Sequence, residues 1–426
     1  MKPINDRPIR IAYAGLGGRG HSSLERLLNM PEVDVVAVCD VYEDRCKRGA
    51  ETVLKAKGHM PDMYTDYRPM VVREDVDAVM VITSWETHAQ IAIEAQRAGK
   101  YVAIEVGGAS SLEECWEMVR TYERTGVPVM MLENCCYDRN EMALLNMVKK
   151  GLFGELIHME GGYMHELRSE IGNGLENRHY RVFNYLNRNG DIYPTHALGP
   201  IAKMLNINRG NRMVTLVSMA SKARGMKEWI RKNKPEDHYL YDKEWNEGDV
   251  VTTLIKCANG ETILLSHNTT IPHPYSRNLT VEGTLGIYME DNQSIAMADP
   301  NSNHLSAEGW EPFNKYVNEK DLQHPLWKEA DDIENNPHAT EGHGNMDYFI
   351  QRAFVESIIN GTPMPISTYD TAAWMAVTCL SEQSVAMGSM PVPFPDFTNG
   401  KWMHPGEPMA TRYTLDDVFP ELYNIQ

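Results

Sequence analysis

A glycine-rich turn between a short apolar segment and a helical segment constrains the fold of this chain more than any other feature. Residues 9–14 (Ile-Arg-Ile-Ala-Tyr-Ala) predict a buried strand that leads into a G-x-G-x-x-G motif formed by Gly15, Gly17 and Gly20. In this motif the first glycine allows a tight turn, the second lets the backbone approach a pyrophosphate, and the third lets the helix pack on the strand. The helix N-terminus then offers N–H groups to phosphates, which predicts a dinucleotide-binding βαβ unit.

An acidic residue lies where such a unit contacts the ribose of its ligand. A second apolar strand is predicted over residues 33–39, and Asp40 follows it, twenty positions after Gly20. A carboxylate there accepts hydrogen bonds from a ribose 2′-hydroxyl and repels a 2′-phosphate, so the motif favours NAD over NADP as the cofactor.

Length and charge narrow the class of protein. At 426 residues the chain is long for one core, so two domains are expected. The net charge of -18 argues against a nucleic-acid or anionic-membrane partner. No apolar run is long enough to span a bilayer, and the first residues lack the apolar core of a secretion signal. The seven cysteines are scattered without a C-x-x-C pair, so neither a disulfide framework nor a metal site is expected.

Alternating strands and helices continue to about residue 133. Further strands are predicted over residues 77–83, 101–105 and 127–132, with a helix over 86–98. This alternation predicts an α/β fold with an N-terminal Rossmann domain over residues 1–133, built on a parallel, doubly wound sheet. Ligands of such sheets bind at the carboxyl ends of the strands.

The pattern changes in the second half, which is predicted to be a C-terminal α+β domain over residues 134–426. Strand-like runs, mostly without crossover helices, cover residues 155–165, 211–219, 249–256, 261–270 and 278–282. They predict an open, largely antiparallel sheet, with a hairpin at Asn259-Gly260. Residues 298–343 are expected to be irregular, and helices are expected over 345–360 and 369–387.

Side chains able to move protons or bind hydroxyl groups occur in this second domain. Pro194 fixes the backbone between Tyr193 and His196, before an apolar helical stretch, so the turn is expected to present a phenol beside an imidazole. The competing interpretation of His196 is a buried histidine bonded to a backbone carbonyl.

Three further side chains, Tyr163, Arg181 and Tyr275, suit sugar faces and hydroxyls, although such residues at strand edges usually serve packing and solvation. His343 lies between Gly342 and Gly344, which lets its imidazole swing; the competing interpretation is a surface-loop histidine.

The chain resembles the glucose–fructose oxidoreductase-like superfamily, and within it glycoside hydrolase family 109, the NAD-dependent α-N-acetylgalactosaminidases. The resemblance covers nearly the whole chain. Its markers are Gly15-Leu-Gly-Gly-Arg-Gly20, Trp85-Glu-Thr-His88, Glu105-Val106, Glu133-Asn-Cys-Cys-Tyr137, His179-Tyr-Arg-Val-Phe183, Asp191-Ile-Tyr-Pro-Thr-His196 and Gly342-His-Gly344. Sugar dehydrogenases of this superfamily usually carry Glu-Lys-Pro after the fourth strand, and the lysine assists removal of a hydroxyl proton. Val106 stands at that place here and cannot move a proton.

The resemblance implies a set of site residues. Those near NAD would be Gly18, Arg19, Asp40, Trp85, Thr87, His88, Glu105, Val106, Asn134 and Tyr193, in addition to the glycines of the loop. Those near the sugar would be Tyr163, Arg181, Tyr193, His196 and Tyr275. The family also places an acid–base histidine in a Gly-Gly-His-Gly-Gly loop, which corresponds to His343, although Glu341 and Asn345 replace the outer glycines.

The implied reaction is a hydrolysis without net redox change. Hydride leaves C3 of the sugar for NAD, the resulting ketone acidifies C2–H, loss of that proton expels the aglycone from C1, and water and hydride then add back. His343 is the implied acid, and His196 or Tyr193 the group that handles the C3 hydroxyl proton. The base at C2 stays open among Tyr193, His196 and Tyr275.

Two alternatives of other classes remain: an NAD-dependent sugar or inositol dehydrogenase, and a non-catalytic, nucleotide-dependent sugar-binding protein. The expected partner is a small molecule or glycan with a terminal N-acetylgalactosamine, and a homo-oligomer is left open. The family implies a periplasmic or secreted bacterial protein if a signal peptide has been removed, and a cytoplasmic one otherwise.

Overall fold

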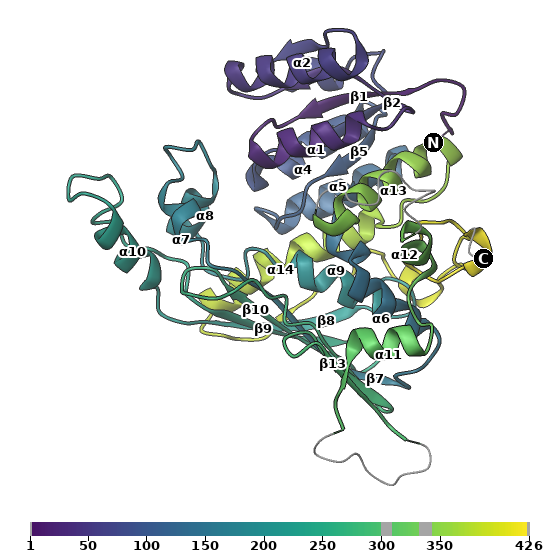
Figure 1. Cartoon of the computed structure of the whole chain (residues 1–426). Helices are drawn as coiled ribbons and strands as arrows, with labels where there is room; N and C mark the ends of the chain where they lie inside the picture. The colour runs from purple at the N-terminus through teal and green to yellow at the C-terminus, as the bar shows by residue number, and fades with distance from the viewer. Residues whose placement is uncertain (1, 300–308, 332–342, 424–426) are drawn as a thin grey trace. The chain divides into compact units, whose positions relative to one another are not determined.

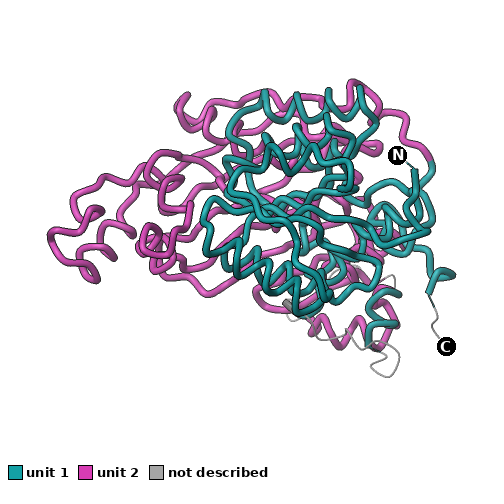
Figure 2. Tube along the Cα trace, turned by 90° about the horizontal axis from the view of Figure 1, so that it is seen from above, with its two compact units in different colours: residues 1–139, 325–373, 407–426 teal, residues 140–324, 374–406 magenta. Residues whose placement is uncertain are grey.

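The computed structural model describes residues 2–299, 309–331 and 343–423 (Figure 1). The chain divides into two compact units, coloured separately in Figure 2. Unit 1 comprises Met1–Arg139, Pro325–Ala373 and Glu407–Gln426, and unit 2 comprises Asn140–His324 and Trp374–Gly406. The sequence predicted a single domain boundary at residue 133. The compact units are instead discontinuous in sequence, because two later segments return to unit 1.

Unit 1 is built on a six-stranded sheet in the order β3-β2-β1-β4-β5-β6. Its strands are β1 (Ile9–Ala14), β2 (Val33–Cys39), β3 (Asp62–Tyr64), β4 (Ala78–Val81), β5 (Tyr101–Ile104) and β6 (Val129–Met131). Every neighbouring pair is parallel, which confirms the doubly wound Rossmann sheet. The strand order reverses between β1 and β4, the place where such sheets bind ligands.

Helices connect these strands and follow the sequence signals closely. They include α1 (Gly18–Leu28), α2 (Glu43–Lys57), α4 (Trp85–Arg97) and α5 (Leu112–Thr125). Helix α5 begins with a capping box, in which Ser111 accepts from the Glu114 N–H and the Glu114 side chain accepts from the Ser111 N–H. It ends at Gly126, whose φ of 70° is accessible to glycine at little cost.

The returning segments pack on the far edge of this sheet and on α1. Helix α13 (Met346–Asn360) contacts α1, where Gln351 donates to the Ser23 hydroxyl at 2.7 Å. At the β6 edge, the hydroxyls of Thr368 and Thr371 accept from the N–H groups of Val129 and Met131. These side chains satisfy edge-strand groups that would otherwise need water or another strand.

Unit 2 is built on a nine-stranded sheet in the order β14-β13-β12-β11-β7-β10-β9-β8-β15. Its strands are β7 (Leu156–Met164), β8 (Met213–Ala220), β9 (Val251–Cys257), β10 (Thr262–Asn268), β11 (Thr280–Gly283), β12 (Gly286–Met289), β13 (Ser294–Met297), β14 (Glu311–Pro312) and β15 (Val392–Pro393). Among the described strands of this sheet, only β7 and β10 pair in parallel, so the prediction of a largely antiparallel sheet is confirmed. The predicted hairpin joins β9 to β10, with Gly260 at a φ of 112°.

Helix α9 (Thr195–Met204) lies against β7 at a glycine. A Cβ atom on Gly161 would come within 2.6 Å of the Ala197 Cβ, so only glycine lets the helix approach this closely. The sequence predicted that Tyr193 to His196 form a turn before a helical stretch; the helix begins at Thr195, so it includes His196 and runs through Pro200. Pro200 cannot donate a helical hydrogen bond and its ring crowds the carbonyl four residues earlier, a cost of about 3 kcal/mol that the buried packing of α9 on β7 must offset.

A second correction concerns residues 298–343, which the sequence predicted to be irregular. Within the described part of this segment the chain forms α11 (Phe313–Glu319) and α12 (Pro325–Ala330). Both helices bury apolar side chains, including Phe313 and Trp327, among surrounding polar residues that obscured the pattern. The other described helices are α3 (Arg68–Val71), α6 (Arg139–Lys149), α7 (Arg168–Gly172), α8 (Arg181–Asn187), α10 (Gly225–Asn233) and α14 (Thr368–Ala386). None of the helices described is both long and apolar enough to cross a membrane.

Candidate active site

The glycine loop of unit 1 has the geometry of a phosphate-binding turn. Gly15 has a φ of 96°, and a Cβ there would lie 2.2 Å from the Ile82 carbonyl oxygen. A Cβ on Gly20 would lie 2.1 Å from the Gly15 carbonyl oxygen, so these two glycines are required by packing. At Gly18 a Cβ would meet no atom within 4 Å, which leaves open space at the first residue of α1. Open space beside a helix N-terminus suits an anionic phosphate.

The loop can be tested by comparing Gly15, which is crowded by backbone atoms, with Gly18, which faces open space. Gly15→Ala forces a strained φ and a backbone clash, and it is expected to lower the free energy of unfolding by about 1–3 kcal/mol or more. Gly18→Ala meets no obstruction and is expected to unfold like the unaltered protein while retaining less NAD. Denaturant unfolding and the NAD content of the purified variants measure both effects. Equal stability of the two variants would contradict the geometry.

Asp40 is tied to this loop. Its Oδ2 accepts from the Leu16 N–H at 2.7 Å, and its Oδ1 accepts from the Tyr42 N–H at 3.0 Å. The Arg45 guanidinium lies 4.0 Å from the same carboxylate. The structure shows that Asp40 fixes the glycine loop, whereas its binding to a ribose stays a prediction. Each carboxylate oxygen has a second lone pair, so both roles are compatible.

The predicted residues after β4 form the first turn of α4. Trp85 is buried, and its ring lies so close to the backbone of Gly107 that a Cβ there would meet the ring at 2.3 Å. The Thr87 hydroxyl donates to the Thr83 hydroxyl at 2.7 Å. The His88 Nε2 pairs with the Thr83 carbonyl at 3.1 Å, and burial lowers the pKa of this imidazole below its usual value. His88 is thus neutral near pH 7 and serves to hold the turn.

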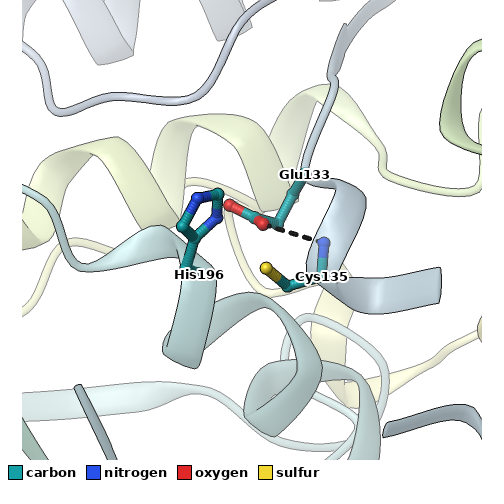
Figure 3. Close-up of side chains that lie close together, drawn as sticks. All are labelled: Glu133, Cys135 and His196. Atoms are coloured by element: carbon teal, nitrogen blue, oxygen red, sulfur yellow. Dashed lines mark hydrogen bonds between the residues drawn. The ribbon is translucent and has the colours of Figure 1, made fainter. Parts of the chain in front are cut away.

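The ends of β5 and β6 carry the remaining predicted cofactor residues of unit 1. Glu105 accepts from the Val106 N–H at 3.0 Å and from Arg19 Nε at 2.9 Å. Asn134 begins the short helix η1 (Asn134–Tyr137), and Figure 3 shows the preceding Glu133 carboxylate accepting from the Cys135 N–H. A glycine turn, a helix N-terminus and an acid after β2 together fit NAD, whose pyrophosphate and ribose hydroxyls need those groups.

The residues predicted to bind sugar gather in unit 2. The Tyr163 ring centroid lies 4.4 Å from that of Tyr193, 5.6 Å from that of His196 and 6.2 Å from that of Tyr275. The Arg181 guanidinium lies 5.3 Å from the centre of the Tyr193 ring. We call these five residues the aromatic cluster. Tyr163 lies on β7 and Arg181 begins α8; Tyr193 precedes α9, His196 lies in its first turn, and Tyr275 follows β10. Aromatic faces beside a guanidinium suit the apolar faces and hydroxyls of a sugar.

Within the aromatic cluster, the predicted phenol–imidazole pair is formed. The Tyr193 hydroxyl and His196 Nε2 are 3.2 Å apart, and Pro194 between them caps α9. A hydrogen bond of this length lets a proton pass between the two side chains or from a bound hydroxyl. His196 Nε2 is thus paired with a phenol, which is the arrangement that the turn was expected to present.

Four polar residues beside this cluster were missed from the sequence. His165 Nδ1 lies 3.4 Å from the Tyr163 hydroxyl, and burial with the nearby Arg181 charge lowers the pKa of its imidazole. Glu170 forms an ion pair with Arg181 at 3.0 Å. Tyr185 and His267 lie behind the cluster, and burial lowers the pKa of His267 to about 3. His165 is two positions from Tyr163, and this spacing places side chains on the same face of a strand. The position of His165 beside Tyr163 could therefore have been predicted from the sequence.

His343 is the one predicted catalytic residue whose side chain lies outside what the structure describes, as do Glu341 and Gly342. Its backbone begins the 3₁₀ helix η2 (His343–Asn345), in which Gly344 has a φ of 63°. The role of His343 therefore stays a prediction.

These features define a class: an NAD-binding Rossmann domain joined to a domain with an open sheet. Residues 9–133 match the family model described as "oxidoreductase family, NAD-binding Rossmann fold", and residues 137–404 match that of the glycosyl hydrolase 109 C-terminal domain. The chain belongs to glycosyl hydrolase family 109, and it is an NAD-dependent glycoside hydrolase.

Relatives span almost the whole chain. A glycosyl hydrolase family 109 protein of Stenotrophomonas maltophilia is 40% identical, covering 93% of this chain and 90% of that protein. An α-N-acetylgalactosaminidase of Tannerella forsythia is 36% identical over 94% of this chain and 88% of that protein. Among solved structures, a levoglucosan dehydrogenase in complex with NADH and levoglucosan shares the fold, with a TM-score of 0.66, 17% identity, and coverage of 92% and 100%.

Proposed function

We propose that this enzyme hydrolyses terminal N-acetylgalactosaminides, mainly α-linked, and that NAD stays bound through the reaction. The Tyr193–His196 hydrogen bond is the observation that carries the proposal, because it supplies a proton acceptor for a sugar hydroxyl. The family of the chain and the name of its Tannerella relative support the substrate.

The chain's own residues divide the work. Bound NAD supplies a hydride acceptor and donor. The glycine loop, Asp40 and the residues after β4, β5 and β6 hold it. Tyr163, Arg181 and Tyr275 orient the sugar, while Tyr193 and His196 take the proton of the C3 hydroxyl.

The second residue after β5, Val106, separates this proposal from a simple dehydrogenase. Val106 is buried and apolar, and its N–H donates to the Glu105 carboxylate. It offers no group that gives or takes a proton, so we assign proton transfer with the sugar to the Tyr193–His196 pair instead.

The test is incubation of the purified enzyme with nitrophenyl α- and β-N-acetylgalactosaminides without added NAD. We expect release of nitrophenolate, faster from the α-anomer, with NAD recovered unchanged from the denatured protein. Net NADH formed from free sugar or inositol would select a dehydrogenase instead, and sugar binding without turnover would select a binding protein.

A second measurement tests the elimination step. Because the C2–H bond is broken and remade, product formed in heavy water is expected to carry deuterium at C2. Proton NMR of the released sugar measures this exchange. Full retention of the original C2 hydrogen would instead support direct displacement, as in glycosidases that use two carboxylates.

A further inference from the structure

A buried carboxylate on α13 holds two of the side chains proposed to face the cofactor. Asp347, the second residue of α13, has a side chain only 1% exposed. It accepts from Arg19 Nη1 at 2.7 Å and from Arg19 Nη2 at 3.0 Å, and from Asn134 Nδ2 at 2.7 Å. Arg26 pairs with it at 3.2 Å. A carboxylate has about four acceptor sites, so these donors fill it.

The bonds fix how Arg19 presents its guanidinium. Asp347 holds both terminal nitrogens in a bidentate pair, and Glu105 accepts from Nε at 2.9 Å. Bidentate pairing fixes the plane of a guanidinium as well as its position. The Arg19 side chain remains 37% exposed, so the clamp orients a cation that still reaches solvent.

The same carboxylate sets the orientation of Asn134. Its amide nitrogen donates to Asp347, so its carbonyl oxygen faces the other way, 3.7 Å from the Cys135 sulfur. That oxygen accepts a weak hydrogen bond from the Cys135 thiol and keeps a second lone pair, which suits a hydroxyl or amide donor of a ligand.

The positive and negative charges around Asp347 are balanced. Arg19 and Arg26 face Asp347 and Glu105, and the Glu105 charge is the largest cause that raises the pKa of Arg19. Two of these side chains, on Arg26 and Asp347, are less than a tenth exposed. Removing one buried partner alone leaves an uncompensated charge.

We propose that Asp347 is a positioning residue for NAD: from a helix outside the segment that matches the NAD-binding family model, it orients Arg19 and Asn134 and so sets the affinity for the cofactor. The proposal rests on the placement of these two residues at NAD stated above. It does not depend on which sugar is cleaved.

The decisive variant is Asp347→Asn, which keeps the shape and removes the charge. We expect the Kd for NAD to rise about 10- to 100-fold, because charge-assisted bonds to Arg19 and Asn134 are lost. Titration of the NAD-free protein measures Kd without any sugar, so failure of the glycosidase proposal does not affect the result. When Arg19 has already been replaced by alanine, Asp347→Asn is expected to raise the Kd for NAD by a much smaller factor.

Arg352→Met is the matched control. Arg352 also joins α13 to the rest of unit 1, through a bidentate pair with Glu32 at 2.9 and 3.0 Å, and neither residue is proposed to contact NAD. It is expected to lower the melting temperature and leave Kd unchanged. If it raised Kd as much as Asp347→Asn does, or if Asp347→Asn left Kd unchanged, the proposal would be overturned.

If Asp347→Asn does not fold, a double variant that keeps the buried charges balanced replaces it in the test. Asp347→Asn combined with Arg26→Leu removes one buried charge of each sign and keeps Arg19 paired with Glu105. We expect this double variant to fold and to bind NAD about as weakly as is expected for Asp347→Asn, because Arg19 again lacks its bidentate partner. Normal NAD affinity in the double variant, or in Arg19→Ala, would refute the positioning role.

Discussion

Replacing His196 by alanine is expected to lower kcat by about 10²–10⁴-fold for every N-acetylgalactosaminide tested, whatever its aglycone. His196 is bonded to the Tyr193 hydroxyl in the aromatic cluster, where it accepts the proton of the sugar C3 hydroxyl. Oxidation at C3 precedes departure of the aglycone, so its rate does not depend on the leaving group. Steady-state kinetics on paired nitrophenyl and alkyl glycosides measure the effect.

His158→Ala is the matched control for this variant. His158 lies on β7, as Tyr163 does, but it pairs with Thr262 and Glu160, and neither belongs to the cluster. Its loss is expected to leave kcat close to that of the unaltered enzyme. A His196→Ala enzyme that loses activity only on substrates with poor leaving groups would mean that His196 acts on the aglycone.

Replacing His343 by alanine is expected to produce the opposite pattern. A nitrophenolate departs with little help, whereas a sugar or serine alkoxide needs a proton. We therefore expect a loss of about 10²–10⁴-fold on natural glycosides and a much smaller loss on nitrophenyl glycosides. The same paired substrates measure it, and both anomers are expected to respond because the flanking glycines give the imidazole reach.

His404→Ala serves as the control for His343, because it removes another histidine that has no assigned role. Equal losses on good and poor leaving groups for His343→Ala would exclude it as the acid. It would then be a loop histidine that affects folding or sugar binding alone.

The parts of the fold that were predictable are those with local signals. The strand, glycine turn and helix of residues 9–28, and Asp40 after the next strand, are fixed by short-range sterics and hydrogen bonding, and the structure agrees with them. The five strands predicted in the second half of the chain could be recognised in the sequence because apolar residues recur along them. The parallel pairing of β7 with β10 carries no such signal, because it joins strands separated by other elements.

The site was predictable where a motif marks it and not where the chain assembles it from distant parts. Tyr193 and His196 lie three residues apart, so a turn brings them together. Asp347 lies 328 positions from Arg19, and its sequence neighbours give no indication of that partner. Glu170 and Arg181 likewise meet only because α7 and α8 fold against each other. Such ion pairs follow from tertiary packing, which composition and periodicity do not encode.

The return of residues 325–373 and 407–426 to unit 1 has a consequence for synthesis of the protein. Domains generally fold from the N-terminus as they leave the ribosome. Here the first 139 residues emerge with Arg19 and Arg26 lacking the Asp347 carboxylate, and with the β6 edge lacking Thr368 and Thr371. The NAD-binding unit therefore completes its packing only after all the strands of unit 2's sheet have been translated, because residues 407–426 follow the last of them. Nascent chains of this enzyme should depend on chaperones for longer than those of a Rossmann protein whose NAD domain is contiguous.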